Sequence, residues 1–402
     1  MISRENIKYS LKNLVKRKGR SSLTIISILI GISTIFIFLS FGLGLYFYVN
    51  GFVTGSTADK VTISPKGIGV PGLDDTFALS DADLKAVQRT VGVYDASGLV
   101  YKTAEVQQGK IKKFTFLVAS DPEKRLLEEF SNIEIINGRG LRKNDQGNVV
   151  LGYNYMIDDK IFPNGFELND LIKINGENLR IVGFYDAVGN PSDDSQIYVN
   201  LDFIDSLYLD SENNFGMIIA RVDVSDMDNA VRNIEKSLRN SRDLEEGEED
   251  FYVASFADML ESYTSALNLV VGFVLLIALI SVLVSAINTA NTMITSVLER
   301  VREIGVIKSI GARNSEILKI FLFESAFLGF VAGVLGVLLG ASIAFVGGSI
   351  LASLGYSFLK PNFHWLLFAG CILFATLTGA ISGVVPAIRA SRINPVDALR
   401  YE

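Results

Sequence analysis

Long uncharged stretches alternate with shorter hydrophobic runs along this chain. Four stretches contain no Asp, Glu, Lys or Arg, and they cover residues 23–49, 262–298, 325–359 and 365–388. Because a helix needs about 20 consecutive apolar residues to cross the bilayer core, each stretch is long enough to span a membrane. We therefore predict four transmembrane helices, at residues 22–48, 264–293, 320–350 and 364–386.

Between the first two predicted spans, residues 49–263 have the pattern of a folded domain. Short β-rich runs predict strands at residues 60–64, 149–151, 171–174, 179–182, 196–199 and 217–222. Ser80 and Asp83 have the spacing of a capping box before a short helix, and Asn175-Gly176 is typical of a hairpin turn. The fold class is therefore an α-helical membrane protein with an α+β extracytoplasmic domain inserted between helices 1 and 2. We expect two subdomains, with residues from about 116 to 214 as an inserted one.

The basic residues between the spans predict the orientation of the chain. Seven Lys or Arg residues lie within residues 1–22, five within the loop 294–319 and three within the tail 387–402. The turn 351–363 contains Lys360 alone. Since cytoplasmic flanks are enriched in Lys and Arg, this pattern predicts that both termini are cytoplasmic.

The net charge of −7 divides unevenly between the parts of the chain. Residues 50–261 have a net charge of −16, and the remainder has +9. The acidic balance is typical of a solvated domain surface, and the basic balance suits a segment beside anionic lipid. We expect membrane lipid as a partner, and no nucleic acid.

The first predicted span is preceded by a segment with two faces. Ile7 and Leu11 share one helical face and Lys8 and Lys12 another, so residues 1–21 are predicted to form a cytoplasmic amphipathic helix on the inner leaflet. A cleaved signal peptide is the competing interpretation. The uncharged stretch is about twice the length of a signal's apolar region, and no A-x-A site follows it. An uncleaved anchor is therefore favoured.

The composition excludes several kinds of chemistry. One cysteine, Cys371, cannot form a disulfide within the chain, and one histidine, His364, offers no His-rich zinc site. The sequence contains no G-x-x-x-x-G-K-[ST] loop for nucleotide phosphates. We therefore predict no catalytic residue, no metal site and no cofactor in this chain.

Small residues recur at helical spacing within the predicted spans. Pairs of glycines four residues apart place two small residues on one helix face, which allows a neighbouring helix to approach closely. The predicted helix-packing residues are Gly329, Gly333, Gly336, Gly340, Gly379 and Gly383. Glu324 is an acid about one turn inside the third span, and we expect it to pair with another helix or to extend towards the membrane surface.

The loop 294–319 contains the most informative pattern. Residues 299–313 predict a short helix that Gly311 ends, with Val301, Ile304 and Lys308 on one face. A simple topological anchor would explain the Arg and Lys residues. It would not explain the apolar face or the glycines, which suit a small protein interface.

At this loop the sequence resembles a known family. The run E-R-V-R-E-I-G-V-I-K-S-I-G-A at residues 299–312 is similar to the signature of the FtsX-like permeases, the MacB group of ABC transporters. The tail at residues 386–400 resembles the ending of that family. Residues 79–101 and 138–202 resemble the MacB-like extracytoplasmic domain. MacB itself carries a fused nucleotide-binding domain, and this sequence contains none.

The resemblance implies a permease of the prokaryotic cytoplasmic membrane that pairs with a second permease copy. A separate ABC ATPase subunit would bind ATP and Mg and dock on the loop, and an extracytoplasmic adaptor or effector is a further partner. The implied coupling residues are Glu299, Arg300, Val301, Arg302, Glu303, Ile304, Gly305, Lys308, Gly311 and Ala312.

Two functions remain open under this resemblance. One is export or extracytoplasmic handling of a peptide, drug or lipid-linked substrate. The other is FtsX-like signalling that regulates an external cell-wall hydrolase. A secondary transporter is disfavoured because the spans lack charges near the midplane, and a membrane enzyme is disfavoured because no catalytic set is present.

Overall fold

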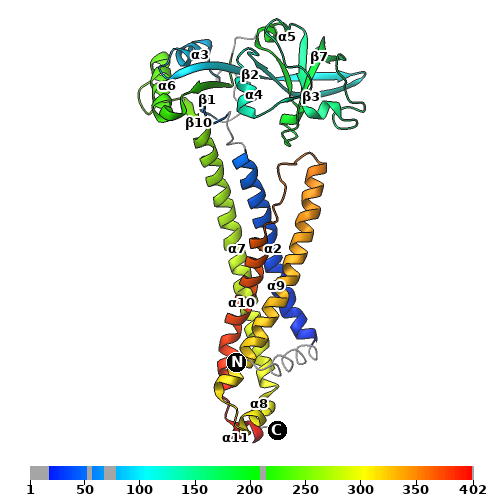
Figure 1. The fold of residues 1–402 in the computed structure, drawn as a ribbon, viewed down its shortest axis with the longest axis vertical. Coiled ribbons are helices and arrows are strands. Elements are labelled where there is room, and N and C mark those ends of the chain that lie inside the picture. The colour runs from blue at the N-terminus through cyan, green and yellow to red at the C-terminus, as the bar shows by residue number, and fades with distance from the viewer. Residues whose placement is uncertain (1–17, 52–56, 68–77, 209–213, 401–402) are drawn as a thin grey trace. The chain divides into compact units, whose positions relative to one another are not determined.

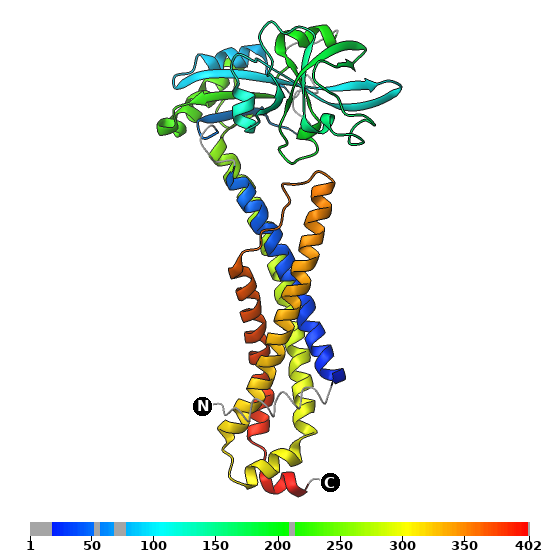
Figure 2. The same ribbon diagram turned by 45° about the vertical axis from the view of Figure 1, so that its right-hand side comes forward.

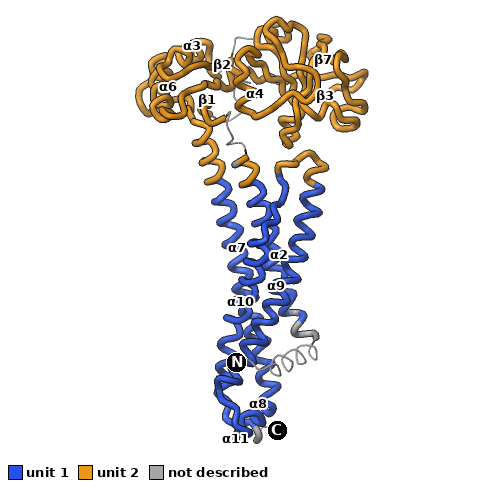
Figure 3. The backbone as a smooth tube through the Cα atoms, in the orientation of Figure 1, with its two compact units in different colours: residues 1–45, 266–350, 359–402 blue, residues 46–265, 351–358 orange. Residues whose placement is uncertain are grey.

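The computed structural model describes residues 18–51, 57–67, 78–208 and 214–400 of the chain. These residues form two compact units (Figure 3). We call residues 1–45, 266–350 and 359–402 the membrane unit, and residues 46–265 and 351–358 the external unit. The amphipathic helix predicted for residues 1–21 lies almost wholly outside the described residues.

The membrane unit is built on four long helices, which run alongside one another in Figures 1 and 2. They are α2 (Lys18–Gly51), α7 (Phe256–Leu298), α9 (Asn314–Ser353) and α10 (Trp365–Ser391). All four are long and apolar enough to cross a membrane. Two short helices also belong to the described part of the unit: α8 (Val301–Ser309) and α11 (Pro395–Arg400).

The helix α7 is longer than the span predicted for residues 264–293. Ser255 and Asp258 form a capping box at its start, in which the Ser255 hydroxyl accepts from the Asp258 amide at 3.1 Å and the Asp258 carboxylate accepts from the Ser255 amide at 3.0 Å. Because these bonds satisfy backbone donors of the first turn, the helix begins directly after the preceding strand.

The external unit is a ten-stranded sheet with short helices. Its strands are β1 (Lys60–Pro65), β2 (Val93–Gln108), β3 (Ile111–Ser120), β4 (Ile135–Gly138), β5 (Asn148–Leu151), β6 (Leu171–Ile174), β7 (Glu177–Tyr185), β8 (Ile197–Asn200), β9 (Met217–Val222) and β10 (Phe251–Ser255). Its α-helices are α3 (Asp81–Gln88), α4 (Leu126–Ser131), α5 (Ile204–Leu207) and α6 (Met227–Arg242). The strand order is β10-β1-β9-β2-β3-β8-β5-β7-β4, and β6 pairs with β2 and β7.

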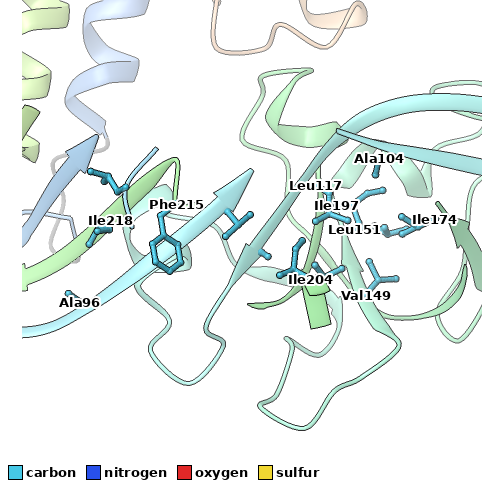
Figure 4. Close-up of a cluster of buried hydrophobic side chains, with 14 of the residues drawn as sticks. Ala96, Ala104, Leu117, Val149, Leu151, Ile174, Ile197, Ile204, Phe215 and Ile218 are labelled. Carbon is cyan, nitrogen blue, oxygen red and sulfur yellow. The ribbon is translucent and has the colours of Figure 1, made fainter. Parts of the chain in front are cut away.

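The long strand β2 joins two parts of this sheet. Its first half pairs antiparallel with β9, with Ala96 opposite Ala220, and its second half pairs with β3, with Glu105 opposite Phe114. One hydrophobic core runs through both parts, and Figure 4 shows Phe215 and Ile218 in one of them and Leu151 in the other. The predicted α+β class is confirmed.

The local turn signals predicted from the sequence are present. Ser80 and Asp83 form a capping box at the start of α3. Asn175 and Gly176 connect β6 and β7 with φ values of +48° and +93°. Positive φ at both central residues is the geometry that Asn-Gly favours in a two-residue hairpin.

The turn after α9 packs within the external unit. The amide of Phe358 donates to the carbonyl of Gly189 at 3.4 Å, and the ammonium of Lys160 donates to the carbonyl of Ser353 at 3.5 Å. The Asp194 carboxylate accepts from the amides of Val188 and Gly189. These bonds hold the loop that contains Gly189, to which the turn is hydrogen-bonded. The sequence predicted an external turn over residues 351–363 and no contact for it.

Candidate functional site

The helix α8 lies in the connection between α7 and α9, where the sequence predicted a short helix. It ends at Ser309, and Gly311 follows with φ of +101°. Such a backbone conformation favours glycine, because a Cβ atom would strain it. The next helix, α9, begins at Asn314, so four residues connect the two helices.

One face of α8 is buried in the membrane unit. The side chain of Ile304 is 3% exposed and belongs to a hydrophobic cluster with Val297 and Phe321. Val301 is half-buried. Ile304 therefore contributes to packing inside the unit, and its side chain offers no surface to a partner.

A buried ion pair holds the start of this helix. The guanidinium of Arg300 lies 3.2 Å from the carboxylate of Glu324, and both side chains are 6% exposed. Arg300 also lies 3.9 Å from Glu303. The pair connects the α7–α8 junction to α9. The carboxylate of Glu324 is thus accommodated inside the membrane unit by its pairing with Arg300.

The opposite face of α8 is exposed. Arg302, Val306 and Ile310 are spaced four residues apart, and so they lie along one side of the helix and its C-terminal cap. Val306 is 47% exposed and Ile310 is 81% exposed. Val306 and Ile310 were not predicted as interface residues, although their spacing from Arg302 is visible in the sequence. We call Arg302, Val306 and Ile310 the outer face of α8.

Two of the predicted coupling residues contact the chain at and after the end of its last long helix: Gly305 lies against α11, and Lys308 binds the end of α10 and the connection to α11. A Cβ atom on Gly305 would come within 2.7 Å of the Cβ of Ala398. The ammonium of Lys308 donates to the carbonyls of Ser391 at 2.9 Å and Ile393 at 2.6 Å. Figures 1 and 2 show α8 and α11 beside each other.

The remaining predicted coupling residues lie at the ends of α8. Glu299, Glu303 and Gly311 are exposed, and Ala312 is half-buried. Of the predicted set, Arg302 and Glu303 thus present charged side chains to solvent on the helix itself. The exposed surface mixes apolar and charged side chains, which suits recognition of a protein.

The six glycines predicted for helix packing all lie at helix contacts. A Cβ atom on Gly379 would come within 2.9 Å of the Cα of Gly329, so α9 and α10 approach closely there. A Cβ on Gly340 would lie 3.1 Å from the Cβ of Phe36 on α2. The sets are Gly329, Gly333, Gly379 and Gly383 between α9 and α10, and Gly336 and Gly340 against α2.

A charged cluster in the external unit was not predicted. The ammonium of Lys60 is fully buried and lies 2.9 Å from the carboxylate of Glu129, and Asp59 and Arg221 complete the cluster. Burial acts to raise the pKa of Glu129, but the hydrogen bonds from Lys60 and Arg221 outweigh it and lower the pKa. These groups neutralise one another, so the cluster holds β1 to β9 and α4.

Among the described residues, no three His, Cys, Asp or Glu side chains gather into a group that could hold a metal ion. Four helices long enough to span a membrane, an inserted strand domain and a short helix with an exposed mixed face define the class as a membrane protein with an inserted extramembrane domain. The sequence matches known families in both of its parts. Residues 21–237 match the MacB-like periplasmic core domain, and residues 275–395 match the FtsX-like permease C-terminal family.

The full length of the chain also matches individual relatives. It is 32% identical over 399 residues to an uncharacterised ABC transporter permease of Methanocaldococcus jannaschii, covering 98% of each chain. It is 26% identical to the uncharacterised ABC transporter permease YknZ of Bacillus subtilis, covering 99% of each. The macrolide export ATP-binding/permease protein MacB of Bartonella henselae is 27% identical over 98% of this chain, which spans 59% of that protein.

The chain therefore belongs to the family of MacB- and FtsX-type ABC transporter permeases. The resemblance noted from the motif at residues 299–312 is confirmed, and membership implies an ABC ATPase as partner.

Proposed function

We propose that this permease works with a separate ATPase subunit, which docks on the outer face of α8. The ATPase binds ATP and Mg, and its closing moves α8 together with the adjoining α7 and α9. The observation that carries this proposal is the division of α8 into a buried face at Ile304 and an exposed apolar face at Val306 and Ile310.

The covalent connections of the helices support transmission to the external unit. The helix α7 follows β10 without a break, and β10 pairs with β1 through contacts such as Val61 opposite Ser255. Movement of α7 along or about its axis therefore acts directly on the sheet. The external unit therefore acts on the substrate. No substrate passes between the membrane-spanning helices.

The cavities of the membrane unit support the last point. One of about 170 Å³ is lined by α2, α7 and Leu359, and one of about 400 Å³ is lined by α2, α7 and α10. Their linings consist of apolar side chains, glycines and Cys371. Such surfaces suit lipid chains and offer little to a polar solute.

A second permease copy is part of the proposal. In the most apolar window of α7 only 11% of residues are buried, whereas the corresponding share is 39% in each of the other three long helices. A second permease copy, as homodimer or heterodimer, would cover the exposed side of α7. Native mass spectrometry of the complex in detergent would give the number of copies.

We propose export or extracytoplasmic handling of a peptide, drug or lipid-linked substrate as the activity. Regulation of an external cell-wall hydrolase, with the external unit as the signalling element, is the alternative. Identification of the protein or compound that crosslinks to the external unit would separate them. A hydrolase whose activity depends on ATP would favour the alternative.

We further propose that the chain resides in the prokaryotic cytoplasmic membrane with both termini inside. In a Cys371→Ala background, cysteines placed at Lys110 and Asn190 should react with an impermeant thiol reagent on intact cells. A cysteine at Ser309 should not react. Labelling of Ser309 from outside would contradict this topology.

The docking test uses a complex isolated through an affinity tag on this chain, in which mass spectrometry identifies the ATPase subunit. Ile310→Asp and Val306→Asp should each lower the amount of that ATPase per permease at least fivefold, and ATP hydrolysis should fall in parallel, because interface anchors lose affinity when a charge replaces them. Val224→Asp is the matched control, since Val224 is 57% exposed in the external unit.

Normal ATPase content in both variants, at equal membrane levels, would exclude docking at the outer face of α8. The permease alone should show no ATP hydrolysis, because its sequence contains no phosphate-binding loop.

A further inference from the structure

We propose that the C-terminal helix α11 is part of the ATPase-docking surface, and that Gly305 and Lys308 are the positioning residues that seat it against α8. This inference rests on the function proposed above. It assigns an interaction surface to α11 and gives Gly305 and Lys308 a role within the permease.

A helix as short as α11 needs external support. It has six residues, whereas isolated helices shorter than about 12 residues are marginal in water. Asn394 supplies a cap, since its side-chain oxygen accepts from the amide of Val396 at 3.2 Å. A single cap makes only a modest contribution to the stability of a helix, so packing must supply the rest.

The packing against α8 depends on two small residues. Ala398 is 1% exposed, and the position of its Cβ leaves room for no side chain on Gly305. Glycine inside a helix makes the helix less stable than alanine would. The presence of glycine at position 305 is explained by the close approach of α11, because a side chain there would clash with Ala398.

Lys308 fixes the segment that leads into α11. Its ammonium donates to the carbonyls of Ser391 and Ile393, which lie at and just after the end of α10. Terminal helix carbonyls lack intrahelical partners, and a basic side chain satisfies them. One side chain thus connects α8, the end of α10 and the segment that precedes α11.

The other side of α11 exposes an apolar side chain beside a charged one. Val396 is 68% exposed, and Asp397 beside it is also exposed. Two exposed apolar positions on adjacent α8, Val306 and Ile310, have the same character. Because the two helices are packed together, a partner docked on α8 lies beside α11 as well. The ATPase is therefore the occupant of the Val396 surface.

The first test asks whether α11 contributes to docking. In the tagged complex, with the ATPase identified as above, Val396→Asp should lower the ATPase content per permease at least fivefold. Val224→Asp again serves as the control. If Ile310→Asp loses the ATPase and Val396→Asp retains it, this inference is wrong and the proposed function stands. If both variants retain it, the proposed function itself is wrong.

The second test asks whether Gly305 and Lys308 position α11. In a Cys371→Ala background, a cysteine at position 398 should be protected from maleimide, because Ala398 is buried. Gly305→Leu and Lys308→Met should each increase its labelling rate at least tenfold. Gly370→Leu is the matched control, since a Cβ at Gly370 meets no described atom within 4 Å. Unchanged protection in both variants would overturn the positioning role.

The third test separates the ATPase from lipid or a second copy as the occupant. Bimane attached to a cysteine at position 396 of the permease in nanodiscs should report a polar environment without the ATPase. Addition of the ATPase should shift its emission to the blue. A blue-shifted emission before addition, in nanodiscs that hold one copy, would assign this surface to lipid. The same emission only in nanodiscs with two copies would assign it to the second copy, and either result would overturn the inference.

Discussion

The membrane unit and the external unit are packed by opposite means. Close contacts between α9 and α10 depend on missing side chains, as at Gly379 and Gly329. The external unit instead fills its core with large side chains such as Leu151, Phe184 and Phe215, each at most 1% exposed. Lipid tails provide no hydrophobic driving force between helices, so close backbone approach replaces it, whereas burial from water dominates in the external unit. Added side chains should therefore damage the membrane unit, and removed ones the external unit.

The strongest exception to this rule is the ion pair of Arg300 and Glu324. Arg300→Leu leaves a buried carboxylate without its cation, and we expect a loss of roughly 3–5 kcal/mol in the stability of the membrane unit. Thermal unfolding of the detergent-solubilised chain measures it. The double variant Arg300→Leu/Glu324→Leu should recover most of the loss, because it removes both charges. A double variant as unstable as the single one would mean that the pair has no special role.

In the external unit the deletion of core volume should have the next largest effect. Leu151→Ala removes a fully buried side chain, which typically costs about 2–5 kcal/mol through lost burial and an added cavity. Urea titration with limited proteolysis of the external unit measures this loss. The control is Leu171→Ala on β6, whose side chain is 61% exposed. Equal stability of Leu151→Ala and Leu171→Ala would contradict the claim that the external unit depends on its buried core side chains.

The converse change, an added side chain, should damage the membrane unit. Gly379→Leu pushes a side chain into the backbone of α9, and overpacking of this kind costs about 1–3 kcal/mol. Gly370→Leu on the same helix enters open space and should leave stability unchanged. Thermal unfolding in detergent compares the two. A stable Gly379→Leu variant would show that α9 and α10 separate without cost.

Much of the membrane unit could be predicted because its signals are local. Uncharged length alone gives the four spans, and spacing by four identifies pairs such as Gly329 and Gly333. The turn at Asn175-Gly176 and the cap at Ser80 are local signals too, and both are found. The strands β2 and β3 were missed because their sequence lacks regular alternation. Their burial changes along the hairpin, from exposed near Ile111 to buried at Leu117.

The faces of α8 could not be assigned from the sequence. The helix is short, and apolar residues occur on both sides, with Ile304 on one and Val306 and Ile310 on the other. Which side is buried depends on α9 and on α11, whose Ala398 lies more than 90 positions along the chain. A helical wheel shows that α8 has apolar residues on two sides. It does not show which segment of the chain packs against either side.

The smallest expected effect concerns a carboxylate at the edge of the external unit. Asp83 is 2% exposed, and its side chain accepts from the Ser80 amide at 2.7 Å and from Arg242 at 2.7 Å. Burial alone would raise the pKa of Asp83, but the Arg242 and Ser80 bonds together lower it. Asp83→Asn should cost about 1–2 kcal/mol at pH 7, through a weaker cap and a lost ion pair between α3 and α6.

The pH dependence of this loss sharpens the test. Because the pKa of Asp83 is lowered in the folded state, its contribution is fully present above the ordinary aspartate pKa of about 4. It disappears as the pH falls through the lower folded-state value. In urea titrations of the external unit, the gap between wild type and Asp83→Asn should therefore narrow from pH 7 to pH 3. Asp81→Asn, at an exposed position in the same helical turn, is the control and should show only a small gap at pH 7. A gap for Asp83→Asn that stays constant over this range would mean that the Arg242 pair contributes nothing to the stability of the unit.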